Sequence, residues 1–279
     1  MKQEKGNYKV ANRQEGISVQ EMLRQRVSLR KYAERPVKDE DLKAIIEGAM
    51  RAPTAGNMMM YSMIIVSDQD IKQRLSETCD HQPFIAKAPL VIVFLADLQR
   101  WFDFYHDSGV ADFCNEQGRE FSGPDEASLM LASCDALIAA QNAAISAEAL
   151  GIGSCYIGDI MENYETHQEL LDLPPYVFPI TMLCFGYYPE GERPKPKERF
   201  ASKFIVSENK YNRLTKQDRE AMFAARAKDF NPKNTWGAKN YGQWMYAKKT
   251  GADFSIEMAR SVRAALENWR GKHVAENIE

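Results

Sequence analysis

Residues 129–150 read LMLASCDALIAAQNAAISAEAL and form the longest candidate helix of the chain. Apolar residues fall on almost every side of this helix, and eight of its residues are alanine. A helix that is apolar all round is normally buried. Its small side chains would let a second helix approach closely, so we expect it either at a dimer interface or in the core of a monomer. Gly151 and Gly153 are expected to end it.

Shorter elements lie on both sides of this helix. Apolar runs predict strands at residues 61–66, 90–96, 154–157 and 179–186. Helical spacing and capping residues predict helices at residues 19–26, 42–50, 69–78 and 164–171. The strands are few, short and interleaved with helices, which predicts a domain of mixed α and β structure. Residues 101–126 are rich in aromatic, glycine and charged residues and are expected to form a loop or short helices over a site.

The C-terminal part follows a stiff connector at residues 193–196, which contains two prolines and cannot pair as a central strand. Beyond it, Thr215 to Asp218 has the pattern of a helix start. Ser255 is expected to cap an amphipathic helix that runs to Trp269.

Composition limits the class of protein. The chain has 279 residues, of which 44% are apolar, so it can bury a full core. It has no run of eighteen apolar residues, so no membrane span is expected. The charged start Met1–Lys5 lacks an apolar signal core, which predicts a cytoplasmic protein. Five cysteines and four histidines stand at irregular spacing, so we expect neither a disulfide framework nor a metal site.

Charge is distributed unevenly along the chain. From residue 200 onward there are 15 Lys and Arg against 9 Asp and Glu, a net charge of +6. The first 199 residues carry 21 against 30, a net charge of −9. This asymmetry suggests that the C-terminal part meets an anion. Because the basic residues are dispersed and the whole protein is acidic, a charged small molecule is favoured over nucleic acid.

Two basic segments far apart in the sequence have the spacing of an anion site. In an extended chain, Arg26, Ser28 and Arg30 share one side, as do Lys197 and Arg199. Together they would present four cations and a hydroxyl group, which suit a phosphate monoester. The alternative is that each segment carries ordinary surface charges.

Several motifs in the same order resemble those of the FMN-dependent nitroreductase family. They are Arg26–Tyr32, the loop Ala52–Asn57, Gln82, the glycine-rich stretch Gly151–Gly158, and Pro196–Arg199. The resemblance covers nearly the whole chain and is greatest to the oxygen-insensitive NADPH nitroreductase and flavin reductase P group. Ser207–Tyr211 resembles the start of the helical extension of that group.

The resemblance implies an α+β, nitroreductase-like fold with a central mixed or antiparallel sheet flanked by helices, built as an intertwined homodimer. Residues 1–200 would form the FMN-binding core. Residues 201–279 would form a helical C-terminal extension that packs on the core and on the partner.

The resemblance also assigns roles to residues of this chain. Arg26, Ser28, Lys197 and Arg199 would hold the phosphate of tightly bound FMN, with Arg30 directed toward the ring and the ribityl chain. The remaining flavin contacts would be Pro53, Thr54, Ala55 and Asn57, supplied by the other subunit, together with Gln82 and the backbone of Tyr156, Ile157, Gly158 and Asp159. Lys233 lies in a stretch that resembles the region near the NADPH 2′-phosphate, or alternatively in a solvated basic loop.

Two departures from the family pattern concern the substrate pocket. Met58–Met60 replace a stretch that supplies an aromatic wall in smaller relatives, and Asp159 stands where a small residue is often found. Asp159 could repel an anionic substrate.

The implied function is an enzyme in which NADPH passes hydride to flavin N5, leaves, and is replaced by a nitroaromatic, quinone or flavin acceptor in a ping-pong reaction. The flavin carries the chemistry, so no catalytic side chain is assigned. Two alternatives remain open: a narrower flavin reaction, such as reductive dehalogenation or flavin fragmentation, and a non-catalytic nucleotide-binding regulatory protein. The expected partners are NADPH, a small-molecule acceptor and a second copy of the chain, without nucleic acid or membrane.

Overall fold

The computed structural model of the protein describes residues 18–191 and 193–270. The segment Met1–Lys5, on which the cytoplasmic prediction rests, lies outside the described residues. Within them, one antiparallel sheet has four strands: β1 (Tyr61–Val66), β2 (Leu90–Asp97), β3 (Ile152–Ile157) and β4 (Val177–Tyr187). Their order is β1-β2-β4-β3, and every neighbouring pair is antiparallel, so the sheet is antiparallel rather than mixed.

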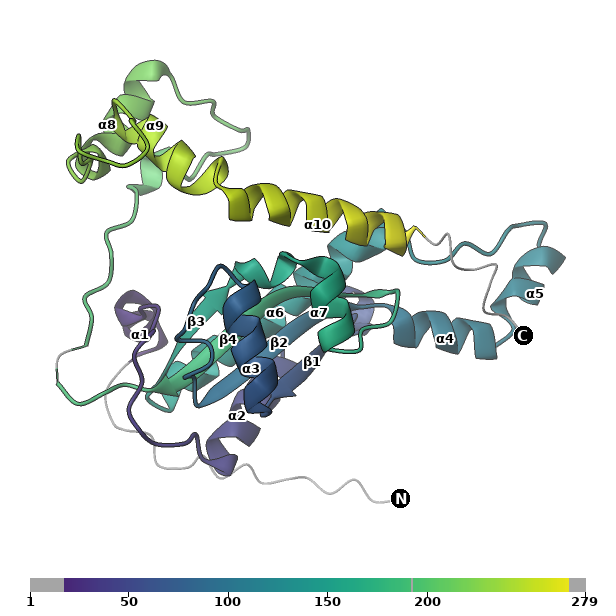
Figure 1. Cartoon of the computed structure of the whole chain (residues 1–279). Coiled ribbons are helices and arrows are strands. Elements are labelled where there is room, and N and C mark those ends of the chain that lie inside the picture. The colour runs from purple at the N-terminus through teal and green to yellow at the C-terminus, as the bar shows by residue number, and fades with distance from the viewer. Residues whose placement is uncertain (1–17, 192, 271–279) are drawn as a thin grey trace.

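The central strands β2 and β4 are buried along their whole length, as the unbroken apolar runs predict. Helices α2 (Asp39–Met50) and α6 (Glu126–Ala149) cover one face of the sheet, and α3 (Gln69–Thr78) covers the other (Figure 1). Burial of both faces explains why the central strands carry no polar alternation.

Gly153 corrects one expectation, because it lies inside β3 instead of ending the long helix. The chain turns at Gly151, whose φ is +74°. Gly153 pairs with Gly186 of β4. A Cβ atom at Gly153 would come within 2.7 Å of the Leu29 side chain, and one at Gly186 within 2.5 Å of the Tyr32 ring. The two glycines therefore make room for residues 29–32 to lie on the sheet.

The long helix α6 begins three residues before the predicted start. Its alanine-rich face packs against α2 and the sheet, while Met130, Leu131, Leu137 and Ile138 remain exposed in the single chain. By length and composition alone, α6 would be able to cross a membrane, contrary to the sequence-based expectation. Its packing on the sheet and its two buried carboxylates, Asp135 and Glu148, are those of a core helix.

Short helices make up most of the remaining regular structure before the extension. At the start of α1 (Val19–Gln25), Ser18 is the N-cap: its hydroxyl accepts the Glu21 N–H. The region expected to be a loop or short helices forms α4 (Gln99–Asp107) and α5 (Val110–Glu116). The other elements of the core are η1 (Ala55–Asn57), η2 (Gly158–Met161) and α7 (Tyr164–Leu170).

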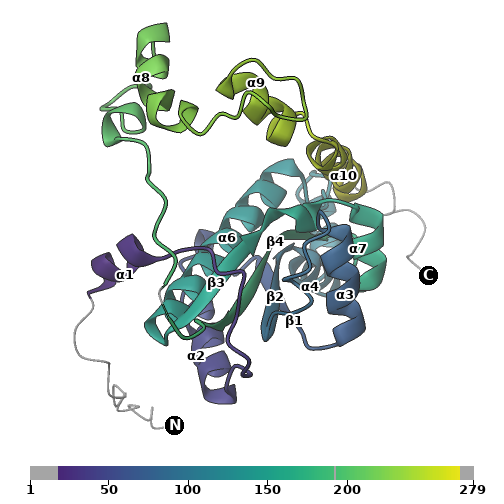
Figure 2. The ribbon, with the colours of Figure 1, turned by 60° about the vertical axis from the view of Figure 1, so that its left-hand side comes forward.

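The C-terminal extension stands away from the sheet and then returns to it (Figures 1 and 2). An extended arm leaves β4 and leads to η3 (Ser202–Phe204), α8 (Lys216–Ala227), α9 (Tyr241–Met245) and a π-helical turn, η4 (Tyr246–Thr250). Helix α10 (Asp253–Trp269) then runs back over α6, α7 and η2, where Trp269 is buried and its Nε1–H donates to the Asp125 carbonyl at 3.0 Å.

The capping predictions for the extension had mixed outcomes. Thr215 begins α8 with a reciprocal capping box to Asp218, as predicted. Ser255 does not cap α10, because the helix is already running there: the N-cap is Ala252, whose carbonyl accepts the Ile256 N–H at 3.1 Å.

Candidate functional site

The segment that contains Arg26 and Arg30 lies along the outer strand β3. Ser28 forms a parallel bridge with Ser154, and the Leu29 N–H donates to the Ser154 carbonyl at 3.0 Å. Leu29 is buried, whereas Ser28 and Arg30 on either side of it are exposed. The segment is therefore extended, with the alternation on which the sequence argument depended.

Arg26 is held over the end of β3 by aromatic and acidic neighbours. Its guanidinium carbon lies 5.9 Å from the centre of the Tyr156 ring. Glu148, which is buried, accepts the Tyr188 O–H at 2.8 Å. Burial raises the pKa of the Glu148 carboxyl, while the Tyr188 hydrogen bond and the charges of Arg193 and Arg26 act in the opposite direction.

The donor groups around this segment suit a phosphate monoester. Arg26 and Arg30 contribute charged guanidinium donors, and Ser28 contributes a neutral hydroxyl donor. Phosphate oxygens accept hydrogen bonds from both kinds of group. The Ser154 hydroxyl beside them is buried without a hydrogen-bond partner. These residues therefore fit the phosphate of a mononucleotide.

Gln82 and Asp159, both predicted flavin contacts, touch each other. The Gln82 side-chain amide donates to the Asp159 carboxylate at 2.7 Å and to the Cys79 carbonyl at 3.0 Å. With its N–H groups engaged in this way, Gln82 has its amide oxygen left as an acceptor for a ligand. Asp159 belongs to η2, the turn that continues β3 after Tyr156 and Ile157.

Cys155 lies inside β3 and is fully buried. Burial raises the pKa of its thiol, so the thiol stays protonated at neutral pH. A buried strand cysteine of this kind is normally an inert residue rather than a nucleophile.

Lys197 and Arg199 lie on the exposed arm between β4 and η3. The arm is anchored near Arg26 at its start, because the Arg193 guanidinium stacks 3.9 Å from the centre of the Tyr188 ring. Both views show the arm on the same side of the molecule as α1, the helix that leads into Arg26 (Figures 1 and 2). The two basic segments predicted to form the anion site thus lie on the same side of the molecule, and their contact with one phosphate stays a prediction.

The loop at Pro53–Asn57 is fixed by a residue that the sequence argument did not single out. The Asp135 carboxylate on α6 accepts the N–H of Ala55 at 3.0 Å and that of Met60 at 3.1 Å. Asp135 is only 2% exposed. An acidic residue within the alanine-rich part of this helix was the available signal, since a buried charge needs partners of this kind.

This loop and the Arg26 segment lie at different points along α6. Asp135, which holds the loop, precedes Glu148 near Arg26 by 13 positions (148 − 135). At the rise of an α-helix this separates them by roughly 20 Å. The loop and the Arg26 segment are therefore anchored at well-separated positions along α6 in the single chain.

A cavity of about 390 Å³ opens beside the Pro53–Asn57 loop. Aromatic residues from α4 and the segment after α5 line it, including Trp101, Phe102, Tyr105 and Phe121. The Trp101 Nε1–H donates to the Met58 carbonyl at 2.9 Å. An aromatic wall therefore exists although Met58–Met60 do not supply it, and residues 101–126 do cover a cavity.

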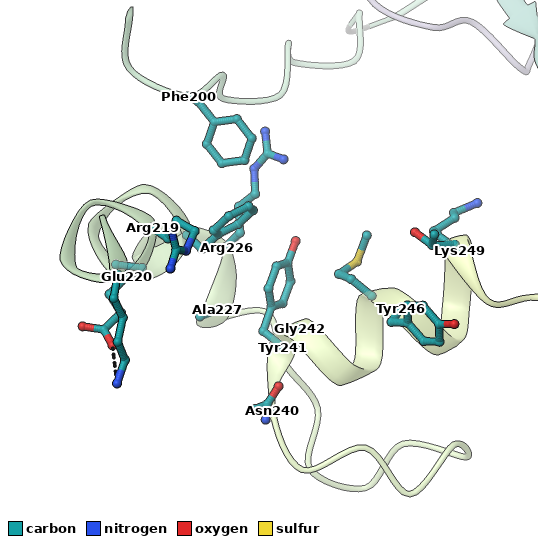
Figure 3. A pocket seen from close by; sticks show the side chains of 15 residues that line it. Phe200, Arg219, Glu220, Arg226, Ala227, Asn240, Tyr241, Gly242, Tyr246 and Lys249 are labelled. Carbon is teal, nitrogen blue, oxygen red and sulfur yellow. Dashed lines mark ion pairs between the residues drawn. The ribbon is translucent and has the colours of Figure 1, made fainter. Parts of the chain in front are cut away.

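A second cavity, of about 780 Å³, lies in the extension between α8, α9 and η4. Figure 3 shows Phe200, Arg226 and Tyr241 on its wall, and the Arg226 guanidinium stacks 3.6 Å from the centre of the Phe200 ring. Lys233 lies in the loop between α8 and α9, exposed and outside this cavity. The α8–α9 region lies well away from α1, the helix that leads into Arg26 (Figure 1).

Comparison with known proteins identifies the family. The nitroreductase family model matches residues 23–187, more than half of the chain. An NADPH-dependent oxidoreductase of Staphylococcus saprophyticus is 27% identical over 206 residues, which cover 74% of this chain and 79% of that protein. The chain therefore belongs to the nitroreductase family, and it is an oxidoreductase.

Solved structures agree with this assignment. The structure of NfrA2 from B. megaterium matches with a TM-score of 0.74 and 30% identity, covering 90% of this chain and 96% of that one. The NfrA1 nitroreductase of B. subtilis matches with a TM-score of 0.74 and 25% identity, covering 89% of this chain and 98% of that one. These matches cover the extension as well as the core.

Proposed function

We propose that the protein is an FMN-dependent NADPH oxidoreductase that reduces a nitroaromatic compound, a quinone or a flavin in a ping-pong reaction. The observation that carries the proposal is the extended Arg26–Arg30 segment on β3, next to the backbone of Tyr156–Asp159. When bound, FMN would supply hydride transfer at N5 between NADPH and the acceptor. The protein would bind its phosphate, orient it and control access.

The first test is direct. Purified protein should be yellow, with oxidised-flavin absorption bands, and should oxidise NADPH when a quinone or nitroaromatic acceptor is added. Retention of FMN through dialysis would support tight binding. A colourless protein that binds another nucleotide would contradict the proposal and support a regulatory binding protein. The five cysteines are all free, which suits the reducing cytoplasm in which we place the protein.

We further propose that the active unit is a homodimer in which the Pro53–Asn57 loop of one subunit completes the site of the other. The support is the exposed apolar face of α6, where Met130 is 67%, Leu137 44% and Ile138 40% exposed in the single chain. Exposed apolar residues gathered on one helix indicate an interaction surface. An obligate dimer of this kind typically buries more than ~2,000 Å².

Charged substitutions on this face test the dimer. We expect sedimentation velocity to give a dimer for the wild type and a monomer with little FMN for Leu137→Lys/Ile138→Lys, because lysines would leave charges buried at the interface. Ile65→Lys is the matched control, since Ile65 is 42% exposed and belongs to β1 rather than to α6. A wild-type monomer that holds FMN would contradict the assembly.

We also propose that NADPH is preferred over NADH because its 2′-phosphate meets the basic loop at Lys233. An exposed contact of this kind is worth about 1–2 kcal/mol, or roughly five- to thirtyfold in kcat/KM. Lys233→Ala should raise KM for NADPH and leave NADH nearly unchanged, whereas Lys239→Ala in the same loop should change neither. The preference should shrink as salt rises, since exposed charges are screened. Equal use of both cofactors by the wild type would refute the idea.

A further inference from the structure

The turn after β3 places two carboxyl groups behind Gln82. Asp159 and Glu162 lie three residues apart in this turn, and the Glu162 N–H donates to the Asp159 carbonyl at 3.0 Å. Glu162 is only 3% exposed, and one of its carboxyl oxygens, Oε1, is buried without a hydrogen-bond partner. Burying an unpartnered carboxyl group costs free energy unless the group is neutral. We therefore considered whether Glu162 has a functional role.

The surroundings of Glu162 keep it protonated. Acidic groups face it from three elements: Asp159 in its own turn, Asp80 after α3, and Glu257 on α10. Burial, followed by the Asp159 charge, raises the pKa of Glu162 to about 8. The Glu162 carboxyl group therefore carries a proton at neutral pH.

Neighbouring groups do not neutralise an ionised Glu162. The nearby cation, Arg260, is paired with Glu257 at 2.8 Å and with Glu165 at 2.7 Å. His167 on α7 is buried, and burial lowers its pKa, so it is neutral. The Cys79 thiol is also buried, and burial raises its pKa well above the usual value, so it adds no charge.

Asp159 connects this buried group to the candidate site. It is half-buried, and its carboxylate accepts the Gln82 amide N–H at 2.7 Å. Gln82 and Asp159 are both residues that the family resemblance places at the flavin, and Glu162 follows Asp159 three residues later. Asp159 is the more exposed of the two carboxyl groups, so we assign it to the acceptor.

We propose that Glu162 stores the proton that reduction of the acceptor consumes, and that Asp159 passes it on. This inference rests on the proposed function. Reduction of a quinone to a hydroquinone takes one hydride, from NADPH, and one proton. In this scheme the O–H bond of Glu162 breaks, its proton moves to the Asp159 carboxylate and then to the acceptor oxygen, and solvent later restores the proton on Glu162. Glu162 acts through Asp159 and is a positioning residue in this sense.

The raised pKa of Glu162 determines the expected pH dependence. The Glu162 carboxyl group is protonated below about pH 8 and loses its proton as the pH rises through that value. With a quinone acceptor, kcat/KM should be flat from pH 6 to 7.5 and fall tenfold per pH unit above pH 8. General acid catalysis typically contributes 10²-fold or more, so Glu162→Gln should lose roughly 10²-fold at pH 6.5 and lose the fall above pH 8.

Ferricyanide accepts electrons without a proton, so its reduction should not depend on Glu162. Comparing it with a quinone acceptor therefore isolates the proton-transfer step. We expect the ratio of quinone to ferricyanide rates to drop roughly 10²-fold in both Glu162→Gln and Asp159→Asn. Glu169→Gln, an exposed carboxyl on α7, is the control and should keep the wild-type ratio. Absence of NADPH-driven ferricyanide reduction by the wild type would overturn the proposed function itself. Normal ferricyanide reduction with unchanged quinone profiles in both variants would overturn only the proton store.

A readout without turnover tests the stored proton directly. Infrared spectra of the wild type minus Glu162→Gln should show the carbonyl band of a protonated carboxylic acid at pH 6.5, and this band should vanish with a midpoint near pH 8. A difference spectrum without that band at pH 6.5 would overturn the proposal. If Glu162→Gln does not fold, the same band should shift in its midpoint in Asp159→Asn, because the neighbouring charge is removed, and an unmoved midpoint would count against the pair.

Discussion

Lys197→Ala/Arg199→Ala should lose FMN on dialysis while keeping its fold. Each charge-assisted contact to a phosphate is worth roughly 1.5–3 kcal/mol. Loss of both should weaken FMN binding on the order of 10²–10⁴-fold. Both residues lie on the exposed arm, so their removal should leave the core intact. A fluorescence titration of the apoprotein with FMN measures the effect.

A matched double variant controls for net charge. Lys210→Ala/Arg213→Ala removes the same two positive charges from exposed positions further along the extension. It should bind FMN as the wild type does, apart from a small change that salt abolishes. An unchanged Kd in Lys197→Ala/Arg199→Ala would show that the arm does not contribute to the phosphate site.

Asp135→Ala should strongly destabilise the protein. The substitution leaves the buried N–H of Met60 and the half-buried N–H of Ala55 without their acceptor. Each unsatisfied donor costs about 1–3 kcal/mol, so the free energy of unfolding should fall by roughly 2–6 kcal/mol. Urea unfolding followed by circular dichroism measures the loss.

Two further variants show whether the loss comes from these hydrogen bonds. Asp135→Asn keeps one acceptor oxygen and should lose about half as much stability. Cys134→Ala alters the adjacent, exposed position and should change stability little. If Asp135→Ala unfolds at the wild-type urea concentration, the carboxylate does not anchor the loop. Because this loop is a proposed flavin contact, FMN binding should fall together with stability.

Regular elements with a clear apolar period could be predicted closely from the sequence. The predicted strand 61–66 and helix 69–78 coincide with β1 and α3, because apolar residues at a fixed spacing stop there at polar residues. The predictions were wrong where one residue type is compatible with two different structural roles. Gly153 follows a helix but serves the packing of Leu29, a contact between residues far apart in the sequence. Ser255 resembles a cap but lies in the first turn of a helix that has already begun.

The residues of the candidate site also differ in how well the sequence predicts them. Arg26, Ser28 and Arg30 could be placed on one side because extended geometry alone determines their alternation. Asp135 and Glu162 could not be assigned roles from sequence, because those roles depend on burial by distant elements. The charge that acts on Glu162 comes in part from Asp80 and Glu257, residues that only the folded chain brings near it.

The backbone contact between residues 28–29 and β3, here called the seam, links binding of a phosphate ligand to local unfolding. A phosphate that holds Arg26 and Arg30 also holds this segment on the sheet, so bound ligand raises the free energy needed to lift it away. The Leu29 amide, hydrogen-bonded across the seam, becomes a reporter: its hydrogen exchange should slow as the site fills. Loss of the ligand should then make the N-terminal segment the first part of the core open to a protease, long before the sheet itself unfolds.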